Sequence, residues 1–298
     1  MGSCSNHALP KLVFEAIKHI DVDRKNSLPV SDFTYRYLQT GTPVVFGDLT
    51  HKWAAYHRWD IPYLKRQLSN KLVSVYSNKV GVNGGNSRKP VMNMPANDYF
   101  DLLSHDEDDL QIRNLSVGEI APQIYDDFEY PRLGLKYRHG TGQLSVGGKG
   151  SIENMHYRPD IAESFLSNFG DKITVLLVRS EEAKYTYEPP WSFESIVTVD
   201  YSAEGLKKHP ALSKLNAYIA DLAHGDTLYI PSEYRYAVYY HGTSIGLTIA
   251  ARPTSPSQSL RSRGNQLIVQ PLDRLAQSLL GAHWQRRKVR KAVRRSKR

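Results

Sequence analysis

The sequence predicts a mainly β protein with flanking helices, and three observations lead to this fold class. From about residue 143 onward, short β-rich runs are separated by Gly, Pro and Asn, at the spacing typical of a barrel or a sandwich. The preceding part mixes helical periodicity with short β-branched runs, and residues 272–298 carry apolar side chains at helical spacing. A chain of 298 residues, 40% of them hydrophobic, can bury a sizeable core in one large domain or two small ones.

Positions 1–40 are expected to form an N-terminal helical segment that covers the β-rich domain. Apolar residues recur at helical spacing over Pro10–Ile20, and Val30–Leu38 is expected to follow as a second helix or a loop. The elements expected before residue 143 are a buried strand at Thr42–Phe46, a helix over Trp53–Leu68, a strand at Leu72–Tyr76, a turn or loop at Gly81–Pro90 and a helix around Asp98–Leu103.

The second half of the chain supplies most of the expected strands. A short helix is expected over Ala211–Leu222, between two of them. The Ser and Pro residues near the start of 254–271 predict a linker, and the final helix over 272–298 follows it. The strands are expected at Gln143–Val146, Ile173–Val178, Ser195–Val199, Thr227–Ile230, Tyr236–Tyr240 and Ile245–Ala250.

The net charge of +9 is concentrated at the C-terminus. Of the 39 Lys and Arg residues, nine lie in 281–298, where there is no acid, which leaves 30 basic against 30 acidic residues in positions 1–280. The body of the protein is therefore formally neutral. The sequence predicts no basic groove of the kind with which a folded domain binds nucleic acid.

The sequence also indicates a cytoplasmic protein. There is no apolar run of the length that spans a membrane, and the first ten residues lack the apolar core of a secretory signal. The single cysteine, Cys4, has no partner within the chain for a disulfide, which agrees with a reducing compartment and excludes a cysteine-based metal cluster.

Two segments carry a resemblance to a known family. Leu144–Tyr157 reads LSVGGKGSIENMHY, which resembles a family motif made of a strand, a Gly-rich turn and a strand that carries a metal ligand. Gly225–Val238 reads GDTLYIPSEYRYAV, which resembles the family pattern GD-x-LYIP-x-x-WWH-x-V. Weaker similarity lies at Gly41–Val45 and at Gly170–Lys172. These motifs resemble those of JmjC-related cupin-like proteins, within the iron(II)/2-oxoglutarate-dependent hydroxylases.

The resemblance covers roughly residues 40 to 250 and implies a double-stranded β-helix, the jelly-roll or cupin fold, over 41–253. It also implies a hydroxylase that uses Fe(II) and 2-oxoglutarate. Such a dioxygenase binds iron through two imidazoles and one carboxylate on one face of the metal, and leaves the other positions to the cosubstrate and oxygen.

Only one of these three ligands, His156, is retained. Arg158 stands where the family has its carboxylate, and a guanidinium has no lone pair with which to bind a metal. Tyr236 stands where the family has its second histidine, and a phenol that titrates near pH 10 is a poor ligand for ferrous iron. The resemblance therefore implies a degenerate metal site.

Two alternatives for the site remain open. Asp160 could turn inward at a bulge and His241 could arrive through a register shift, so that both join His156 in a non-standard metal site. Lys172 corresponds to the basic residue with which family members pair the distal carboxylate of 2-oxoglutarate, but the same lysine fits an ordinary exposed turn. Arg158 could instead pair with Glu153 or with a ligand carboxylate, and this would make the pocket, with Tyr236, anion-accepting.

The final helix is amphipathic and strongly cationic. Its residues Arg286–Arg298 could bind nucleic-acid phosphates or an anionic membrane surface. The alternative is a terminus that only improves solubility and whose first half packs on the barrel. C-terminal helices of this kind in similar proteins mediate dimers, so a homodimer is also expected.

Three functions are consistent with the sequence. The first is a cupin-like pocket without the usual iron chemistry and without cofactors, which binds a small anionic ligand, a peptide or a protein segment. The second is an active 2-oxoglutarate-dependent hydroxylase with a non-standard iron site. The third is a protein that acts mainly through its basic tail.

Overall fold

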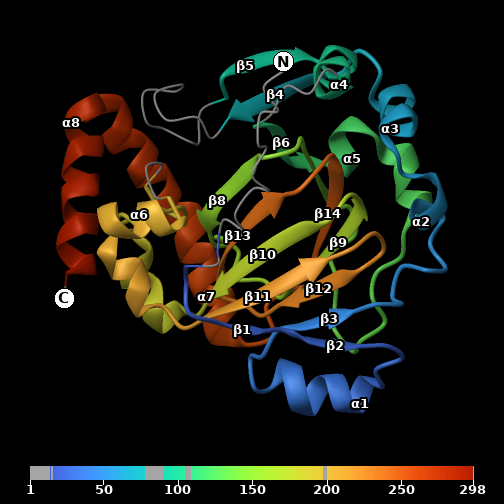
Figure 1. Ribbon diagram of the computed structural model, residues 1–298, viewed down its shortest axis with the longest axis horizontal. Coiled ribbons are helices and arrows are strands. Elements are labelled where there is room, and N and C mark those ends of the chain that lie inside the picture. Colours follow the sequence, from blue (N-terminus) through green and yellow to red (C-terminus); the bar gives the residue numbers. More distant parts are fainter. Residues whose placement is uncertain (1–13, 15, 78–89, 105–108, 197–199, 298) are drawn as a thin grey trace, which may run out of the picture.

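The computed structural model describes residue 14 and residues 16–77, 90–104, 109–196 and 200–297. In it, two β-sheets face each other, with helices outside them (Figure 1). The smaller sheet has the strand order β1 (His19–Asp21), β11 (Ala217–Leu222), β10 (Ile173–Val178), β13 (Arg235–Tyr240), β8 (Ile152–His156). The larger sheet has the order β2 (Asp23–Lys25), β3 (Val44–Phe46), β12 (Thr227–Ile230), β9 (Ser164–Gly170), β14 (Ser244–Ala250), β7 (Gln143–Gly147), β6 (Leu110–Ser116), β4 (Leu72–Ser77), β5 (Met92–Pro95).

The helices lie in three groups around the sheets. One group lies at the outer end of the larger sheet, beyond β4 and β6, and consists of α2 (Ala54–Arg58), α3 (Ile61–Leu68), α4 (Ala96–Ser104), α5 (Val117–Ile120) and the 3-10 turn η2 (Pro122–Asp127). A second group, α1 (Val30–Phe33) with η1 (Thr34–Leu38), lies beside β2 and β3. The third lies on the β8 side and consists of η3 (Ser180–Thr186), α6 (Ala203–Lys208), η4 (Pro210–Lys214), α7 (Pro256–Gly264), η5 (Asn265–Val269) and α8 (Gln270–Ser296).

Apolar side chains fill only part of the space between the two sheets. Val175 and Leu177 of β10 pack there against Leu166 of β9 and Leu228 of β12, and all four are buried. Side chains alternate between the two faces of a strand, so the opposite face of β10 packs Leu176 outward against the η4 side. The part of the interior near β8 is polar, and it contains the site described below.

Most of the predicted elements are confirmed. Strands form at Val44–Phe46, Leu72–Ser77, Gln143–Gly147, Ile173–Val178, Thr227–Ile230, Arg235–Tyr240 and Ser244–Ala250, and helices form at Val30–Leu38 and Ala96–Ser104. The predicted loop at 81–90 lies outside the described residues except for Pro90, as do 197–199 of the predicted strand at 195–199, whose first two residues are not in a strand.

Three local predictions are wrong because pairing or local breaks override helical periodicity. Residues 217–222 form strand β11, which pairs with both β1 and β10, and 19–20 of the predicted first helix belong to β1. The predicted helix over 53–68 divides at Trp59, whose backbone is extended, and Asp60 caps α3 by accepting a hydrogen bond from the Tyr63 amide.

The predicted linker is helical, and the final helix is a hairpin. Ser255 and Gln258 form a capping box that starts α7, and the helical path continues into α8. Gly281 has φ +47°, a conformation that favours glycine, and there the chain turns back. Trp284 Nε1 and Lys288 Nζ of the second half both donate to Asp273 of the first half, at 3.0 and 2.6 Å. No helix in the described ranges is long and apolar enough to cross a bilayer.

One glycine contact fixes the position of an interior tyrosine. A Cβ on Gly147 of β7 would lie 2.5 to 2.6 Å from atoms of the Tyr240 ring, whereas one on Gly246 of the adjacent β14 would meet its nearest neighbour, Leu166, at 3.4 Å. The Tyr240 ring thus packs directly on the backbone of the opposite sheet.

We therefore expect Gly147→Ala to lower the free energy of unfolding by about 1–3 kcal/mol, because the ring must move within a packed interior. Gly246→Ala, on the neighbouring strand, serves as the matched control and is expected to change it by less than about 1 kcal/mol. Urea denaturation of both variants measures the difference, and equal effects would contradict this packing of Tyr240.

Candidate functional site

A cavity of about 760 Å³ lies where the polar end of the sheet interior meets the C-terminal hairpin. Its wall on the sheet side includes Tyr76, Arg113, Glu153, His156 and Glu194, and α8 contributes Gln270, Asp273, Gln277 and Gln285. Three aromatic residues, Tyr157, Trp191 and Phe193, line it as well. Two charged side chains of this wall, Glu153 and Arg113, are 8% and 12% exposed.

A β-bulge places Glu153 and His156 on the same inner face of β8. Residues three apart on a regular strand point to opposite faces. Here four residues, 153–156, oppose the three residues 236–238 of β13, because His156 pairs with Tyr236 and Glu153 with Val238. The extra residue directs Asn154 and Met155 outward, where the Asn154 amide contacts the Ser195 carbonyl and Met155 packs in the outer core.

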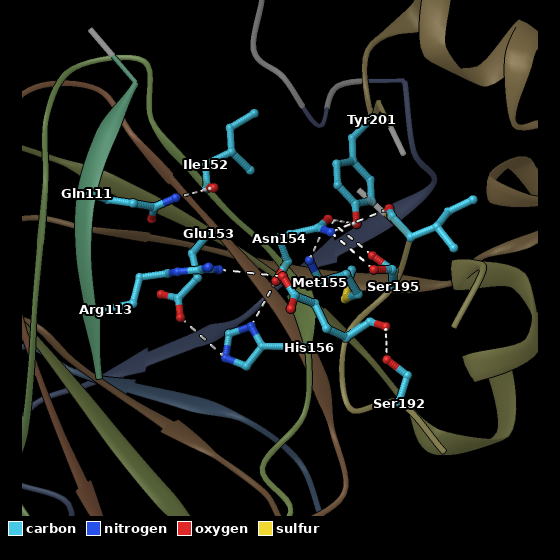
Figure 2. Close-up of polar contacts among 12 residues, drawn as sticks. Gln111, Arg113, Ile152, Glu153, Asn154, Met155, His156, Ser192, Ser195 and Tyr201 are labelled. Atoms are coloured by element: carbon cyan, nitrogen blue, oxygen red, sulfur yellow. Dashed lines mark hydrogen bonds and ion pairs between the residues drawn. The ribbon is translucent and has the colours of Figure 1, made fainter. Parts of the chain in front are cut away.

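Figure 2 shows Glu153, His156 and Arg113 directed toward one another. His156 Nδ1 lies 2.8 Å from the Asn154 carbonyl oxygen, which can only accept, so Nδ1 carries the proton. This leaves Nε2 facing the Glu153 carboxylate at 3.5 Å. The imidazole is thus oriented by the backbone on one side and faces a buried carboxylate on the other.

Arg113 comes from a second bulge, on β6. Ile112 pairs with Val146 and Leu115 with Leu144, so one extra residue lies between them, and Asn114 adopts φ +53°. Arg113 Nη1 lies 3.5 Å from Glu194 Oε1, and its guanidinium stacks 4.2 Å from the centre of the Tyr76 ring. A carboxylate and an aromatic face therefore both stabilise this cation.

Arg158 is held by other side chains at the edge of this site. Its Nε and Nη2 donate to the two oxygens of Asp160 at 3.1 and 2.7 Å, and Nη1 donates to Gln143 Oε1 at 2.7 Å. Burial disfavours the charged form of Arg158, but the Asp160 carboxylate more than offsets this, so the pKa of Arg158 lies above its ordinary value. The Arg158 guanidinium is thus a fully engaged, permanent cation, and its partner is Asp160 rather than Glu153.

Tyr236 lies beside His156, with ring centres 4.2 Å apart. Burial, reinforced by the negative charge of Glu153, raises the pKa of the Tyr236 phenol above its ordinary value. Tyr236 therefore stays protonated at neutral pH.

A family model described as a cupin-like domain matches residues 30–251, which include the strands that carry this site. The chain belongs to the cupin-like domain family. Its two facing sheets are consistent with a cupin. The cupin-like domain thus includes β8 and β13 with the whole Glu153–His156 cluster, whereas the hairpin that closes the cavity lies beyond it.

Two residues named from the sequence lie away from this cavity of the cupin-like domain. Lys172 Nζ donates to Asp221 Oδ2 at 3.1 Å, and His241 Nε2 lies 2.8 Å from Thr174 Oγ1. His241 follows the end of β13, five residues beyond Tyr236, so its backbone is roughly 16 Å from the level of His156 at about 3.3 Å per residue. Burial lowers the pKa of His241, which keeps it neutral in this separate cluster.

The metal set suggested from the sequence, His156 with Asp160 and His241, does not converge. Asp160 is engaged by Arg158, and His241 lies beside Thr174. Within the described ranges, no group of three or more His, Cys, Asp or Glu side chains is arranged to hold a metal ion.

Sequence reasoning missed other charged residues of the cavity, among them Arg113 and Glu194. Neither lies in one of the two family motifs, and both reach the site through structural features that no local sequence pattern predicts. Arg113 depends on a bulge, and Glu194 on an isolated bridge between its backbone and that of His156. Glu153 lies within the first motif, but its distance of three residues from His156 predicts the opposite face of a regular strand, so only the bulge reveals that it shares the site.

We expect the Arg158–Asp160 pair to be worth about 1 kcal/mol in a double-mutant cycle with Arg158→Gln and Asp160→Asn, because it is bidentate and only 16% and 32% exposed. The Arg132–Glu129 pair, 88% and 59% exposed, is the control and should couple by less than about 0.5 kcal/mol. Chemical denaturation of the two cycles gives both energies. Equal coupling would mean that Asp160 does not hold Arg158 in this pair.

Proposed function

We propose that this protein is a cupin-like, double-stranded β-helix protein with a degenerate iron site, and that its cavity binds a small polar ligand or a protein segment without a metal. The state of Arg158 and Tyr236 carries this proposal. Both stand at positions where related hydroxylases bind iron, and Arg158 is engaged as a cation while Tyr236 is held as a neutral phenol.

The residues present do not fit iron(II). A metal site of this kind needs a carboxylate beside His156, but the Asp160 carboxylate is bound by Arg158, and the guanidinium itself would repel a metal cation. The Glu153 carboxylate does face His156 Nε2. Two side chains do not replace the facial set of three, and we derive no oxidative step from them.

The cavity nevertheless has the composition of a binding site. It combines aromatic walls with a few buried polar and charged groups, which is typical of small-molecule pockets. Buried charged groups such as Glu153 cost stability unless they are paired, and proteins keep them chiefly where they serve binding or catalysis. An active hydroxylase with a non-standard iron site is the alternative that the following experiment excludes or supports.

Protein purified without oxygen and loaded with Fe(II) is expected to retain far less than one iron per chain, and His156→Ala is expected to retain the same small amount. Metal analysis by mass spectrometry after desalting measures this. Thermal melting with Mn(II) and 2-oxoglutarate, alone and together, is the second measurement, and we expect no joint stabilisation. About one iron per chain in the parent protein and none in His156→Ala would contradict the proposal and support the hydroxylase.

A second candidate function is favoured by the surface of the C-terminal hairpin. In the second half of α8, Lys288 is buried against Asp273, whereas the cations around it face solvent. Residues four apart are neighbours on a helix surface, so these exposed cations form two adjacent rows. One row is Arg286, Arg290 and Arg294, and the other is Arg287, Lys291 and Arg295. We propose that this basic face binds a phosphate-rich partner.

Truncation after Gly281 would not test this cleanly, because it would also remove Lys288 and leave the Asp273 carboxylate without that partner. We use the exposed cations instead. Arg290→Gln with Arg294→Gln is expected to weaken binding to a 30-nucleotide single strand or to anionic vesicles. For the single strand, the slope of log affinity against log salt should fall in magnitude by roughly 1.4, about 0.7 for each cation removed. Fluorescence anisotropy and vesicle sedimentation measure the two cases.

The control for this experiment is a double variant of exposed cations elsewhere, Arg132→Gln with Lys207→Gln, which should bind as the parent does. Equal losses in both double variants would show only a general charge effect and contradict a specific face. The homodimer expected from the C-terminal helix remains a prediction, and the exposed Leu272, Leu275 and Leu279 on the first half of α8 give it a surface.

A further inference from the structure

We infer that the cavity recognises a protonated nitrogen, such as a primary amine, and that Glu153 is the carboxylate that binds it. This inference rests on the proposed metal-independent pocket and names the class of its ligand. It differs from the sequence-based expectation of an anion, which depended on a free Arg158.

The Glu153 carboxylate is buried with much of its hydrogen-bonding capacity unused. The Glu153 side chain is 8% exposed, and its polar contact among the described residues is His156 Nε2 at 3.5 Å, longer than an ordinary hydrogen bond. A carboxylate can accept about four hydrogen bonds, and leaving this capacity unused in a buried position is costly. Glu153 lines the cavity, so a ligand with N–H donors can supply what the protein does not.

The balance of charge around Glu153 also favours a cation. Two guanidinium groups in this part of the interior are already compensated, Arg113 by Glu194 and Arg158 by Asp160. The other arginine that lines the cavity, Arg274 of α8, is an exposed residue. Lys172 is paired with Asp221 in the separate cluster. A ligand ammonium beside Glu153 would therefore meet a negative charge that forms no ion pair with an arginine or lysine of the described residues.

The aromatic wall of the cavity is suited to the same ligand. Phe193 packs against Tyr157 with ring centres 5.1 Å apart, and Trp191 packs against Trp284 at 5.6 Å, so the rings are held in place. Both Phe193 and Trp191 line the cavity, and the cations that stack on rings among the described residues lie over tyrosines instead. Aromatic faces attract ammonium groups, and this attraction adds to that of a carboxylate.

The same features disfavour a dicarboxylate. An anion placed against Glu153 would meet like charge at a buried carboxylate, where repulsion is screened less than at the surface. The pocket thus discriminates between ligands by the sign of their charge.

The experiment compares matched probes by calorimetry in the presence of EDTA. The probes are n-butylamine and 1,4-diaminobutane, their neutral counterparts 1-butanol and 1,4-butanediol, and the dianions succinate and 2-oxoglutarate. We expect an amine to bind the full-length protein at least about tenfold more tightly than its alcohol, and Glu153→Gln to abolish this preference because it keeps the shape but removes the charge.

Glu204→Gln, on the exposed face of α6, is the matched control and should retain the preference. Thermal melting checks that Glu153→Gln folds, and Glu153→Asp replaces it if it does not, with weaker amine binding expected from the shorter side chain. Failure of both amines to bind, or equal binding to Glu153→Gln, overturns the inference. Metal-free binding of succinate instead would overturn it but leave the metal-independent pocket standing, whereas binding that requires Fe(II) would overturn the proposed function itself.

Discussion

The pairing of β8 with β13 is the constraint on which the site depends. Because four residues of β8 oppose three of β13, Glu153 and His156 share the inner face, and Tyr236 lies beside the imidazole. A regular ladder would have turned one of the two side chains into the outer core, among the apolar residues that contact Met155. A second bulge, on β6, brings Arg113 to the same cavity. Two irregular strands thus build a polar site inside an otherwise apolar fold.

Charge pairing explains how such a site is tolerated. Buried ions are costly when they are isolated, and Arg113, Arg158 and Asp273 each have a partner of opposite charge within 3.5 Å. Glu153 differs, because its contact is an imidazole rather than a permanent cation. Arg158 is therefore part of a structural ion pair, while the Glu153 carboxylate faces the cavity.

The C-terminal hairpin connects the site to the surface of the molecule. Its first half supplies one wall of the cavity, and its second half packs on the η3 side and carries the basic rows outward. Asp273 joins the halves, because it accepts hydrogen bonds from Trp284 and Lys288. Trp284 also contacts Trp191 at the cavity. A partner bound to the basic face would thus lie one helix away from the ligand.

Local patterns in the sequence were sufficient to predict the β-rich second half and the resemblance to the cupin-like family, since alternation and motif order are local properties. The strand at 217–222 required the three-dimensional structure, because that segment is held by pairing with β1 and β10 against its own helical periodicity. The character of the pocket required it too. A local pattern cannot predict that Arg158 is paired with Asp160, because this depends on its neighbours in the fold. It also cannot predict that Glu153 points inward, because this depends on a bulge.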